Sequence, residues 1–411
     1  MPGRDWYAAF LNLGDYFTAL LAIAVVCSAA YCVLVLLSAE KYLASSRTAF
    51  VGQVSSLRPP SRPPSPEDDG ASSVSPPISI ITPVSGAEPG LVENLRSSFE
   101  QDYPEFEVLI VAHAPSDPAV AVAEKLIAAY PRAGARVVVS GVPPCPNAKV
   151  FNLEAAVAAA RHDILVMKDS DVRTGADMLA TIAREFAGSA AALVTCPYRA
   201  IASRGFWWGL DAIGTNTRFF GGVLVARMLG GMDFALGPTL AIRKDALARL
   251  GGLAQFRDYL AEDFLLGNRA HAAGMGVILS SYCVDHHFGG GSARSNFRHR
   301  LRWSRSTRRS RGFAYVGEVF THPVPLALAL LAWSPAWWPL AAAALALRAA
   351  NAWVVAGRVL RARPGAREWL LMWIDDLAAF VFWAAGLSGN RITWRGQQYA
   401  LGAGGRFTRI S

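Results

Sequence analysis

Three short motifs contain residue types that could act together on a diphosphate. Asp169 and Asp171 form an Asp-x-Asp motif at the end of an apolar run, and hard carboxylate oxygens suit Mg²⁺ or Mn²⁺ bridged to phosphate. Asp263 could serve as an acid or base. Arg302, followed by Trp303, could supply a planar cation for a leaving pyrophosphate. Each motif alone also fits a chance match, a solvated helix start or a surface patch.

The composition indicates a membrane protein with one sizeable soluble domain. The chain has 411 residues, of which 53% are hydrophobic and 17% are charged. Residues 16–37 carry no charged side chain and can cross a hydrocarbon core of about 30 Å at about 1.5 Å per residue. Basic residues follow this run, whereas a cleaved signal peptide has them first. We therefore expect a short segment, 1–15, before a retained anchor, 16–37.

The charges that flank the anchor predict its orientation. Arg4 is offset by Asp5 and Asp15, and the following side is basic, with Lys41, Arg47, Arg58 and Arg62. The positive-inside rule then places the main domain in the cytoplasm. The net charge of +9 is better explained by anionic lipid headgroups and a nucleotide diphosphate than by nucleic acid, because the arginines adjoin apolar runs.

Strand-like and helix-like patterns alternate between residues 78 and 186. Strands are expected at 78–84, 107–112, 136–140 and 163–167, and helices at 90–99, 117–130, 149–160 and 175–186. This alternation is typical of an α/β domain with a mostly parallel sheet, which binds ligands at the carboxyl ends of its strands. Asp169 and Asp171 lie at such an end.

The segments around this domain have other predicted roles. Residues 38–77, rich in proline and serine from 55 onward, predict a flexible tether. The aromatic segment 205–228 predicts either an interfacial helix or ordinary core. Residues 323–388 predict two or three spans, with a hairpin at Ser334 preferred by the positive-inside rule, before a basic tail, 389–411. Asp375 and Asp376 should face protein, because a carboxylate in lipid costs several kcal/mol.

Short sequences spread over nearly the whole chain carry a family resemblance. They lie at residues 81–86, 147–153, 169–171, 237–245, 251–252, 261–263, 301–303 and 389–394. Together they resemble ceramide glucosyltransferases and the similar bacterial transferases that glycosylate hopanoids. The resemblance implies a GT-A (Rossmann-like) catalytic domain at 78–312 with transmembrane helices on both sides, a UDP-sugar donor and inversion at the anomeric carbon. It also implies a multi-pass protein of the bacterial inner membrane.

The resemblance assigns roles position by position. The positions implied at the donor are Lys149, Asn152 and His299, together with Asp169 and Asp171 as ligands of Mg²⁺ or Mn²⁺. Asp263 would be the general base, and Arg302 and Trp303 would close on the leaving diphosphate and the sugar. Glu262 should matter less, because the next residue along a helix points about 100° away.

The chain departs from the family pattern at two positions. Ala114 replaces an aspartate that usually follows the second strand, and Asp117 comes three residues later. His299 stands where the family usually has Gln or Arg, and a histidine can still donate a hydrogen bond. His286 and His287 lack a complete set of metal ligands nearby and are expected at the pocket edge, without metal.

These patterns predict a membrane-bound transferase that adds one sugar, glucose or N-acetylglucosamine, to the hydroxyl of a membrane lipid, ceramide or a hopanoid. Three alternatives stay open. A processive polysaccharide synthase shares the motifs but needs roughly six or more helices. A catalytically impaired homologue could bind lipid or nucleotide without turnover. A nucleic-acid binder could use the arginine run at 294–311.

Overall fold

The computed structural model describes residues 4–56, 75–202, 205–289, 292–394 and 396–410, and the chain divides into two compact units. Unit 1 combines Met1–Leu43, Arg204–Leu229 and Gly291–Gly404, and unit 2 combines Ala44–Ser203, Gly230–Gly290 and Gly405–Ser411. Each unit is therefore assembled from three pieces of sequence. Residues 205–229 and 292–312 of the predicted catalytic domain fall in unit 1, and the central part of the predicted tether, 57–74, lies outside the described residues.

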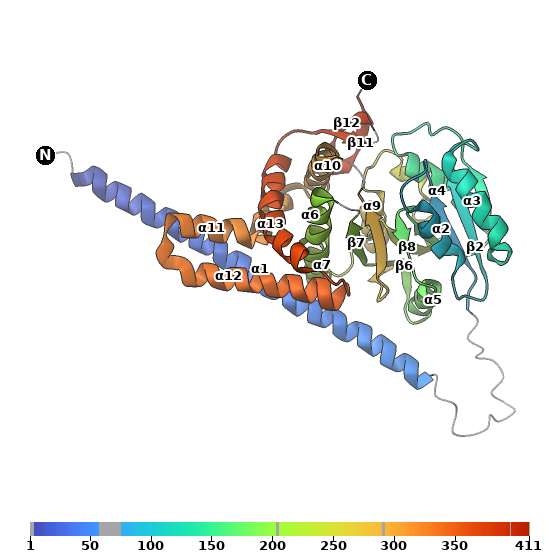
Figure 1. Ribbon diagram of the computed structural model, residues 1–411, viewed down its shortest axis with the longest axis horizontal. Helices are drawn as coiled ribbons and strands as arrows, with labels where there is room; N and C mark the ends of the chain where they lie inside the picture. Colours follow the sequence, from blue (N-terminus) through green and yellow to red (C-terminus); the bar gives the residue numbers. More distant parts are fainter. Residues whose placement is uncertain (1–3, 57–74, 203–204, 290–291, 395, 411) are drawn as a thin grey trace. The chain divides into compact units, whose positions relative to one another are not determined.

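Unit 2 is built on a seven-stranded sheet with the order β3-β2-β1-β4-β8-β6-β9 (Figure 1). Its strands are β1 Ile78–Pro83, β2 Phe106–Ala112, β3 Arg136–Val139, β4 Ile164–Lys168, β6 Ala191–Thr195, β8 Thr239–Arg243 and β9 Gly276–Leu279. Strand β8 runs antiparallel to β4 and β6, and the other neighbouring strands are parallel. This confirms the α/β fold with a mostly parallel sheet.

The helices of unit 2 pack on this sheet through apolar faces. They are α2 Leu91–Phe99, α3 Pro118–Ala129, α4 Ala148–Ala159, α5 Met178–Ala187, α8 Lys244–Arg249 and α9 Glu262–Ala272. Leu109 and Leu165 of the strands lie in one core cluster with Leu153 of α4 and Leu266 of α9. Each such buried leucine contributes about 1.5–3 kcal/mol, so these contacts hold α4 and α9 against the sheet.

A smaller sheet, with the order β5-β10-β7, lies in the same unit. Its strands are β5 Val172–Arg173, β7 Tyr198–Ala202 and β10 Val284–Phe288. Strand β10 pairs with β5 in antiparallel register, so that His286 lies opposite Val172. The residues that follow Asp171 are thereby joined to a strand more than a hundred positions later in the chain.

The last residues of the chain belong to unit 2 and hold the loop before α9. The amide of Phe407 donates to the carbonyl of Asp258 at 2.8 Å, and Tyr259 and Arg406 form an isolated antiparallel bridge. The Phe407 side chain is fully buried. The expected basic tail, 389–411, is therefore structured, with β11 Arg391–Trp394 and β12 Gln397–Leu401 paired in unit 1 and β13 Phe407–Arg409 in unit 2.

Unit 1 consists mainly of helices. They are α1 Arg4–Ser56, which continues past the unit, α6 Phe206–Gly214, α7 Phe220–Gly230, α10 Ala293–Arg311, α11 Pro323–Trp333, α12 Trp338–Ala352 and α13 Ala366–Gly386, with π-helical turns at Thr215–Phe219 and Trp353–Val359. Helix α1 runs to Ser56, through residues that the sequence assigned to the tether. The first proline after the apolar run is Pro59, so nothing in the local sequence ends the helix earlier.

Three helical segments of the described chain are long and apolar enough to cross a membrane: Leu13–Ser46, Pro335–Val359 and Ala366–Gly386. A fourth would be the pair Ala293–Thr321 and Pro323–Trp333, bent by 57°, if it counts as one broken span. Helices α11 and α12 form the hairpin expected at Ser334 (Figure 1). They pack with α1 through Val25, Leu330 and Ala344.

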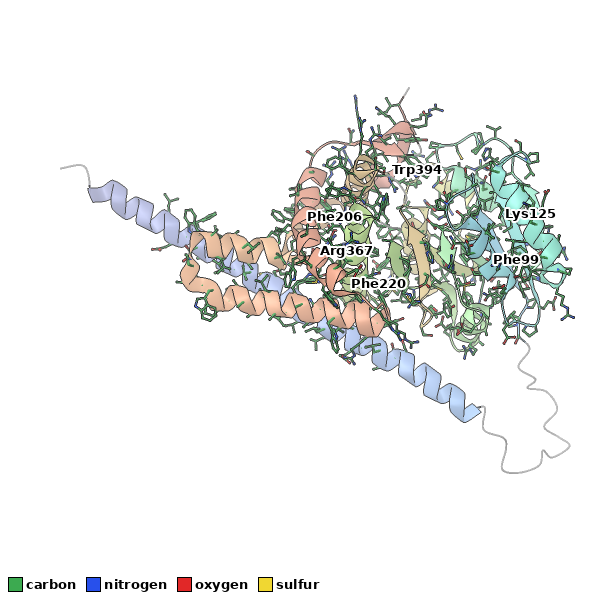
Figure 2. All side chains as sticks on the ribbon, in the orientation of Figure 1. Phe99, Lys125, Phe206, Phe220, Arg367 and Trp394 are labelled. Carbon is green, nitrogen blue, oxygen red and sulfur yellow. The ribbon has the colours of Figure 1, made fainter. Side chains whose placement is uncertain are left out.

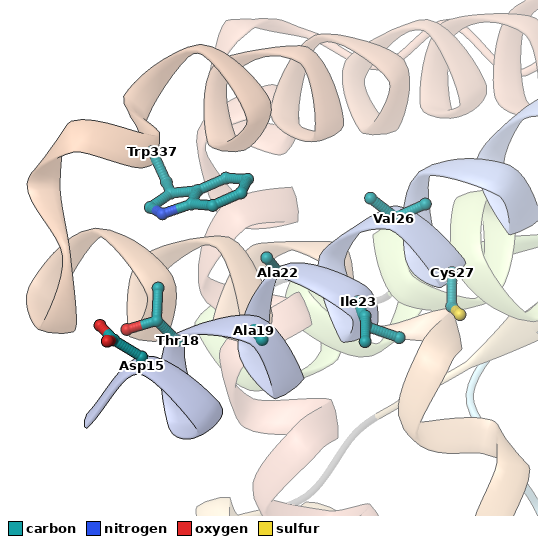
Figure 3. Close-up of a pocket in the computed structure, with 8 residues that line it drawn as sticks. All are labelled: Asp15, Thr18, Ala19, Ala22, Ile23, Val26, Cys27 and Trp337. Carbon is teal, nitrogen blue, oxygen red and sulfur yellow. The ribbon is translucent and has the colours of Figure 1, made fainter. Parts of the chain in front are cut away.

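A groove of about 530 Å³ lies between α1 and Trp337 (Figure 3). Ala19, Ala22 and Ile23 line it, and Asp15 lies at its edge. The lining is mostly apolar, as expected for a helix surface that faces lipid chains.

The two carboxylates in α13 are fully buried inside unit 1, as predicted. Asp376 accepts hydrogen bonds from Arg348 of α12 at 2.6 and 2.8 Å. Asp375 pairs with Arg300 of α10. A buried carboxylate paired with an arginine avoids the cost of facing lipid alone.

Candidate active site

The Asp-x-Asp turn follows β4 and is fixed from three sides. The amide of Asp169 donates to the carbonyl of Pro238 at 3.0 Å, and its carbonyl accepts from the amide of Val172 at 3.2 Å. The carbonyl of Asp171 accepts from the amide of His287 at 2.7 Å. Both side chains therefore stand at the carboxyl end of a buried parallel strand, where α/β sheets bind ligands.

Lys149 lies in the first turn of α4 and faces this edge. Asn147 caps the helix by accepting from the amide of Val150 at 3.2 Å. The Lys149 ammonium lies 2.7 Å from an oxygen of Asp169 and 3.1 Å from an oxygen of Glu262. Burial alone would lower the pKa of Lys149, but these carboxylates outweigh it and raise the pKa, so the group stays a cation.

Glu262 contacts the predicted donor-binding residue Lys149, and the milder effect expected of its substitution stays a prediction. Besides its pair with Lys149, it accepts a hydrogen bond from the Asn147 amide at 3.2 Å. Asn147 also donates to the carbonyl of Tyr259 at 2.8 Å. Glu262 and Asn147 thus join the start of α9 to the start of α4.

Asp263, the next residue of α9, has the protonation behaviour that a base needs. Burial, and then the neighbouring charge of Glu262, raise the pKa of Asp263 from 3.8 to about 7, with Lys149 opposing. A carboxylate with a pKa near the working pH exchanges a proton efficiently. The absence of a side chain at Gly237 leaves room for the Asp263 carboxylate, because a Cβ at this position would lie 2.6 Å from one of its oxygens.

His286 of β10 contacts the second aspartate of the motif. Its Nε2 lies 3.1 Å from an oxygen of Asp171, and its ring stacks edge-on against Tyr198 at 5.3 Å. Burial alone would raise the pKa of Asp171, but His286 together with Lys149 and a backbone hydrogen bond lowers it below its ordinary value. Burial alone would lower the pKa of His286, and Asp171 raises it instead. The histidine thus helps to keep Asp171 ionised.

The two aspartates fit a divalent cation. The Oδ1 atom of Asp171 is buried and makes no hydrogen bond within the described residues, so it is available to a metal. The described part of the chain contains no group of three or more His, Cys, Asp or Glu side chains placed to hold a metal. A Mg²⁺ ion is usually held by one or two carboxylates together with water and substrate phosphates.

The third motif lies in unit 1, on α10. Arg302 Nη2 lies 3.3 Å from His299 Nδ1, and the ring of Trp303 stacks edge-on against Phe219 at 5.9 Å. Trp303 is 43% exposed, so a large part of its ring is accessible to a ligand. The structure therefore brings His299, Arg302 and Trp303 together in one unit, and Lys149 with the aspartates in the other.

Part of the arginine run on α10 supports the fold. Arg305 donates to the carbonyls of Ser388 and Arg391 at 3.2 and 2.5 Å, and Arg308 donates to Leu387 at 2.6 Å. These carbonyls follow the end of α13, where unpaired C=O groups and the helix dipole attract cations.

The family profile described as Glycosyl transferase family 21 matches residues 22–407. The chain belongs to glycosyl transferase family 21. Among curated proteins it is similar to ceramide glucosyltransferase 1 of Caenorhabditis elegans, with 29% identity over 209 residues, 50% of this chain and 44% of that protein. A ceramide glucosyltransferase of Komagataella phaffii is 39% identical over 99 residues, 23% of this chain and 19% of that protein. These matches span less than half of the relatives' own lengths.

Two solved structures resemble this family 21 chain more distantly. A mannosyltransferase from Pyrobaculum calidifontis, in complex with GDP-Man and Mn²⁺, covers 88% of this chain and 98% of its own, with 21% identity and a TM-score of 0.47. A glucosyl-3-phosphoglycerate synthase from Mycobacterium tuberculosis, with Mg²⁺ and UDP, covers 62% and 79%, with 17% identity and a TM-score of 0.36. Family 21 membership, together with the mostly parallel sheet, confirms the GT-A class expected from the sequence.

Asp117, which follows Ala114 by three residues, makes hydrogen bonds within unit 2. Asp117 accepts from the amides of Ala119 and Gly86 at 2.9 and 2.8 Å, so it caps α3 and holds the turn after β1. Asn152, a predicted donor-binding residue, accepts from the Ser140 hydroxyl at 2.7 Å. Its role toward a donor in this family 21 protein stays a prediction.

Sequence reasoning missed two contacts of the site, those of Glu262 and His286. Glu262 stands beside the predicted base, but its partner Lys149 is more than a hundred residues away. His286 was noticed as half of a histidine pair, and only the pairing of β10 with β5 brings it to Asp171. Glu262 begins α9 and His286 lies within β10, and no local pattern in the sequence pairs either residue with its partner.

Proposed function

We propose that this protein is a membrane-bound, inverting glycosyltransferase that moves one sugar from a UDP-sugar to the hydroxyl of a membrane lipid. Asp263 is the observation that carries the proposal, because it lies one residue from Glu262, which pairs with Lys149, and its pKa is raised to about 7. Membership of glycosyl transferase family 21 supports the same chemistry.

Asp263 would act as the general base. The acceptor hydroxyl attacks the anomeric carbon from the face opposite UDP, its proton passes to the Asp263 carboxylate, and the bond from carbon to the phosphate oxygen breaks. One displacement of this kind inverts the anomeric centre, and UDP leaves with the electron pair. A positioned base of suitable pKa accelerates such a step by about 10²–10⁴-fold.

The remaining residues would hold the donor. Asp169 and Asp171 would bind Mg²⁺ or Mn²⁺, which neutralises charge on the diphosphate when bound. Lys149 and Asn152 would contact the uridine and phosphate region. Arg302, oriented with His299, would pair with the leaving diphosphate as a planar cation, and Trp303 would contact the sugar.

We infer ceramide as the first acceptor to test and glucose as the first sugar. The relatives named above are ceramide glucosyltransferases. The apolar helices of unit 1 supply surfaces that suit a lipid with long chains. A hopanoid polyol and N-acetylglucosamine are the alternatives. Three or four candidate spans among the described residues are fewer than the roughly six or more that a polymer channel requires.

The same reasoning places the protein in the membrane. We infer that it is a multi-pass protein of the bacterial inner membrane with the catalytic residues on the cytoplasmic side, where basic residues follow α1. Exposed arginines of α10, such as Arg294 and Arg298, would meet anionic lipid headgroups. Arg305 and Arg308 instead donate to carbonyls of the segment after α13.

Mass spectrometry of lipids after incubation with the purified protein tests this function. UDP-glucose and UDP-N-acetylglucosamine are each offered with ceramide, a hopanoid polyol or diacylglycerol in vesicles. One lipid should gain a single sugar, and Asp263→Asn should abolish the gain. A series of products with increasing numbers of sugars would support the processive synthase, and no glycosylated lipid in any combination would refute the proposal.

A further inference from the structure

Asp211 of α6 contacts three side chains on one face of α10. Its Oδ1 accepts from Arg300 Nε at 3.2 Å, and its Oδ2 accepts from the Asn296 amide at 3.3 Å. The same Oδ2 lies 3.6 Å from His299 Nε2. Residues 296, 299 and 300 are three and four apart, so they share a helix face. All of these residues belong to unit 1.

His299 connects Asp211 to Arg302. A guanidinium can only donate hydrogen bonds, so the 3.3 Å contact between Arg302 Nη2 and His299 Nδ1 requires Nδ1 to be the acceptor. The neutral ring must then carry its hydrogen on Nε2, which is the nitrogen that faces the Asp211 carboxylate. A carboxylate stabilises the tautomer whose N–H points toward it.

We propose that Asp211 is a positioning residue for sugar transfer, and that it acts through His299 on Arg302. Asp211 selects the tautomer with hydrogen on Nε2, and His299 then offers Nδ1 as the acceptor that fixes the Arg302 guanidinium. The inference rests on the proposed role of Arg302 at the leaving diphosphate. It adds a residue of α6 to a motif that the sequence places entirely on α10.

The competing explanation is that Asp211 only balances a buried charge. Arg300 is 7% exposed and pairs with Asp211 and also with Asp375 of α13. Asp375 is tightly enclosed, since a Cβ at Gly214 would overlap its carboxylate. Asp375 pairs with the same arginine, and none of its hydrogen bonds or ion pairs described here reaches His299. It is therefore a matched control for a purely structural role.

Asp211→Asn tests the tautomer directly. If the Asn carbonyl faces Arg300, its NH₂ group faces His299 Nε2 and favours the ring with hydrogen on Nδ1. Arg302 then meets a donor instead of an acceptor. Imidazole ¹⁵N chemical shifts of histidine-labelled protein in nanodiscs, with His299 assigned by its loss in His299→Gln, report which nitrogen carries the hydrogen. The wild type should show hydrogen on Nε2, and Asp211→Asn should shift it to Nδ1.

Kinetics in two backgrounds test the consequence. Glutamine has an amide that can turn to present either its donor or its acceptor, so a His299→Gln background should be indifferent to Asp211→Asn. When His299 is present, we expect Asp211→Asn to lower kcat by about 10²-fold, similar to loss of one oriented donor in an active site. The double variant should have a kcat only a few-fold below that of His299→Gln alone. Asp375→Asn should cause the same loss in both backgrounds.

Two outcomes would overturn the inference: an unchanged ¹⁵N pattern in Asp211→Asn, or an equal loss of kcat from Asp211→Asn in both backgrounds. If Asp211→Asn does not fold, His299→Leu leaves both partners of Arg300 in place and must lose more activity than His299→Gln. Equal rates for His299→Leu and His299→Gln would also refute the proposed action of Asp211 through His299 on Arg302. A wild type that transfers no sugar would refute the proposed function, while the ¹⁵N shifts would still decide the tautomer.

Discussion

The ammonium of Lys149 lies 2.7 Å from the carboxylate of Asp169, so that the start of α4 is joined to the end of β4. Both side chains are partly buried, and Lys149 also pairs with Glu262. A bound diphosphate would offer Lys149 a further anionic partner at the same edge of the sheet. The pair therefore places a cation where the donor's phosphates are expected, and it makes substitutions of Lys149 and of its second partner, Glu262, informative.

Lys149→Met should weaken donor binding and lower stability. Without the ammonium, Asp169 and Glu262 lose their shared partner, and removal of one member of a buried pair costs about 3–5 kcal/mol at most. We expect the KM for UDP-sugar to rise by at least about tenfold. Lys125→Met is the control, because Lys125 is exposed on α3 (Figure 2). A wild-type KM in Lys149→Met would exclude contact with the donor.

Glu262→Gln should raise the KM more than it lowers kcat. Glu262 contacts Lys149 and Asn147, so we expect its charge to position Lys149 and not to accept the acceptor's proton. Steady-state kinetics with varied UDP-sugar separate the two parameters. A loss confined to kcat would instead assign Glu262 a part in the chemical step.

Asp263→Asn should lower kcat by about 10²-fold or more, with little change in donor affinity. Asp245→Asn is the control, because Asp245 occupies the same second position of its own helix, α8, on the surface. In the wild type, transfer should rise with pH up to about 7 and then level off, because the base must be deprotonated. Comparable rates for Asp263→Asn and wild type would reject the mechanism.

The difference in stability between wild type and Asp263→Asn should also depend on pH. The folded protein holds the Asp263 proton more tightly than the unfolded chain, so this group lowers stability as pH rises from 3.8 to about 7. Thermal unfolding at pH 8 should therefore show the variant at least as stable as wild type. A helix-dipole role alone would make the variant less stable, by about 0.3–1 kcal/mol.

Chelation should stop transfer, and Mg²⁺ or Mn²⁺ should restore it. Asp171→Asn should raise the Mn²⁺ concentration needed, which electron paramagnetic resonance of bound Mn²⁺ measures independently of turnover. Asp177→Asn, at an exposed carboxylate outside the motif, is the matched control. Full activity in chelator would show that the site, which has Ala114 where the family has aspartate, works without metal.

A cysteine at position 65 should be protected from impermeant thiol reagents added outside intact cells. The basic residues after α1 favour the cytoplasm for this side of the helix. Asp15→Cys, at the opposite end of the Leu13–Ser46 span, should be labelled from outside. Labelling of Ser65→Cys from outside would show that the topology is the reverse of the one predicted. The catalytic residues would then have no access to cytoplasmic UDP-sugars.

Local sequence predicted the sheet well because buried parallel strands are unbroken apolar runs. The helix expected at 149–160 is α4, Ala148–Ala159, and the strand expected at 163–167 is β4, Ile164–Lys168. The Asp-x-Asp motif lies at a strand end for the same reason. Periodicity says nothing about strand direction, so the reversed β8 was not foreseen.

Contacts between segments far apart in the chain could not be predicted from the sequence. The pairs of Lys149 with Glu262 and of Asp171 with His286 depend on which elements become neighbours. The aromatic segment 205–228 could be interfacial or core on composition alone. In the structure, Trp207 is exposed and Phe220 is fully buried within its unit, so part of the segment is core and the interfacial position of the rest stays a prediction.

The contact of Phe407 with Asp258 ties the loop before α9 to the last described residues of the chain. Residues 405–407 come after every described helix longer than one turn in the sequence, yet they hold the loop that leads to Asp263. A chain truncated before residue 405 would keep those helices and lose both these backbone contacts and the buried Phe407 side chain. Truncation at this point should therefore disturb the predicted base, Asp263, although the cut lies more than a hundred residues after it.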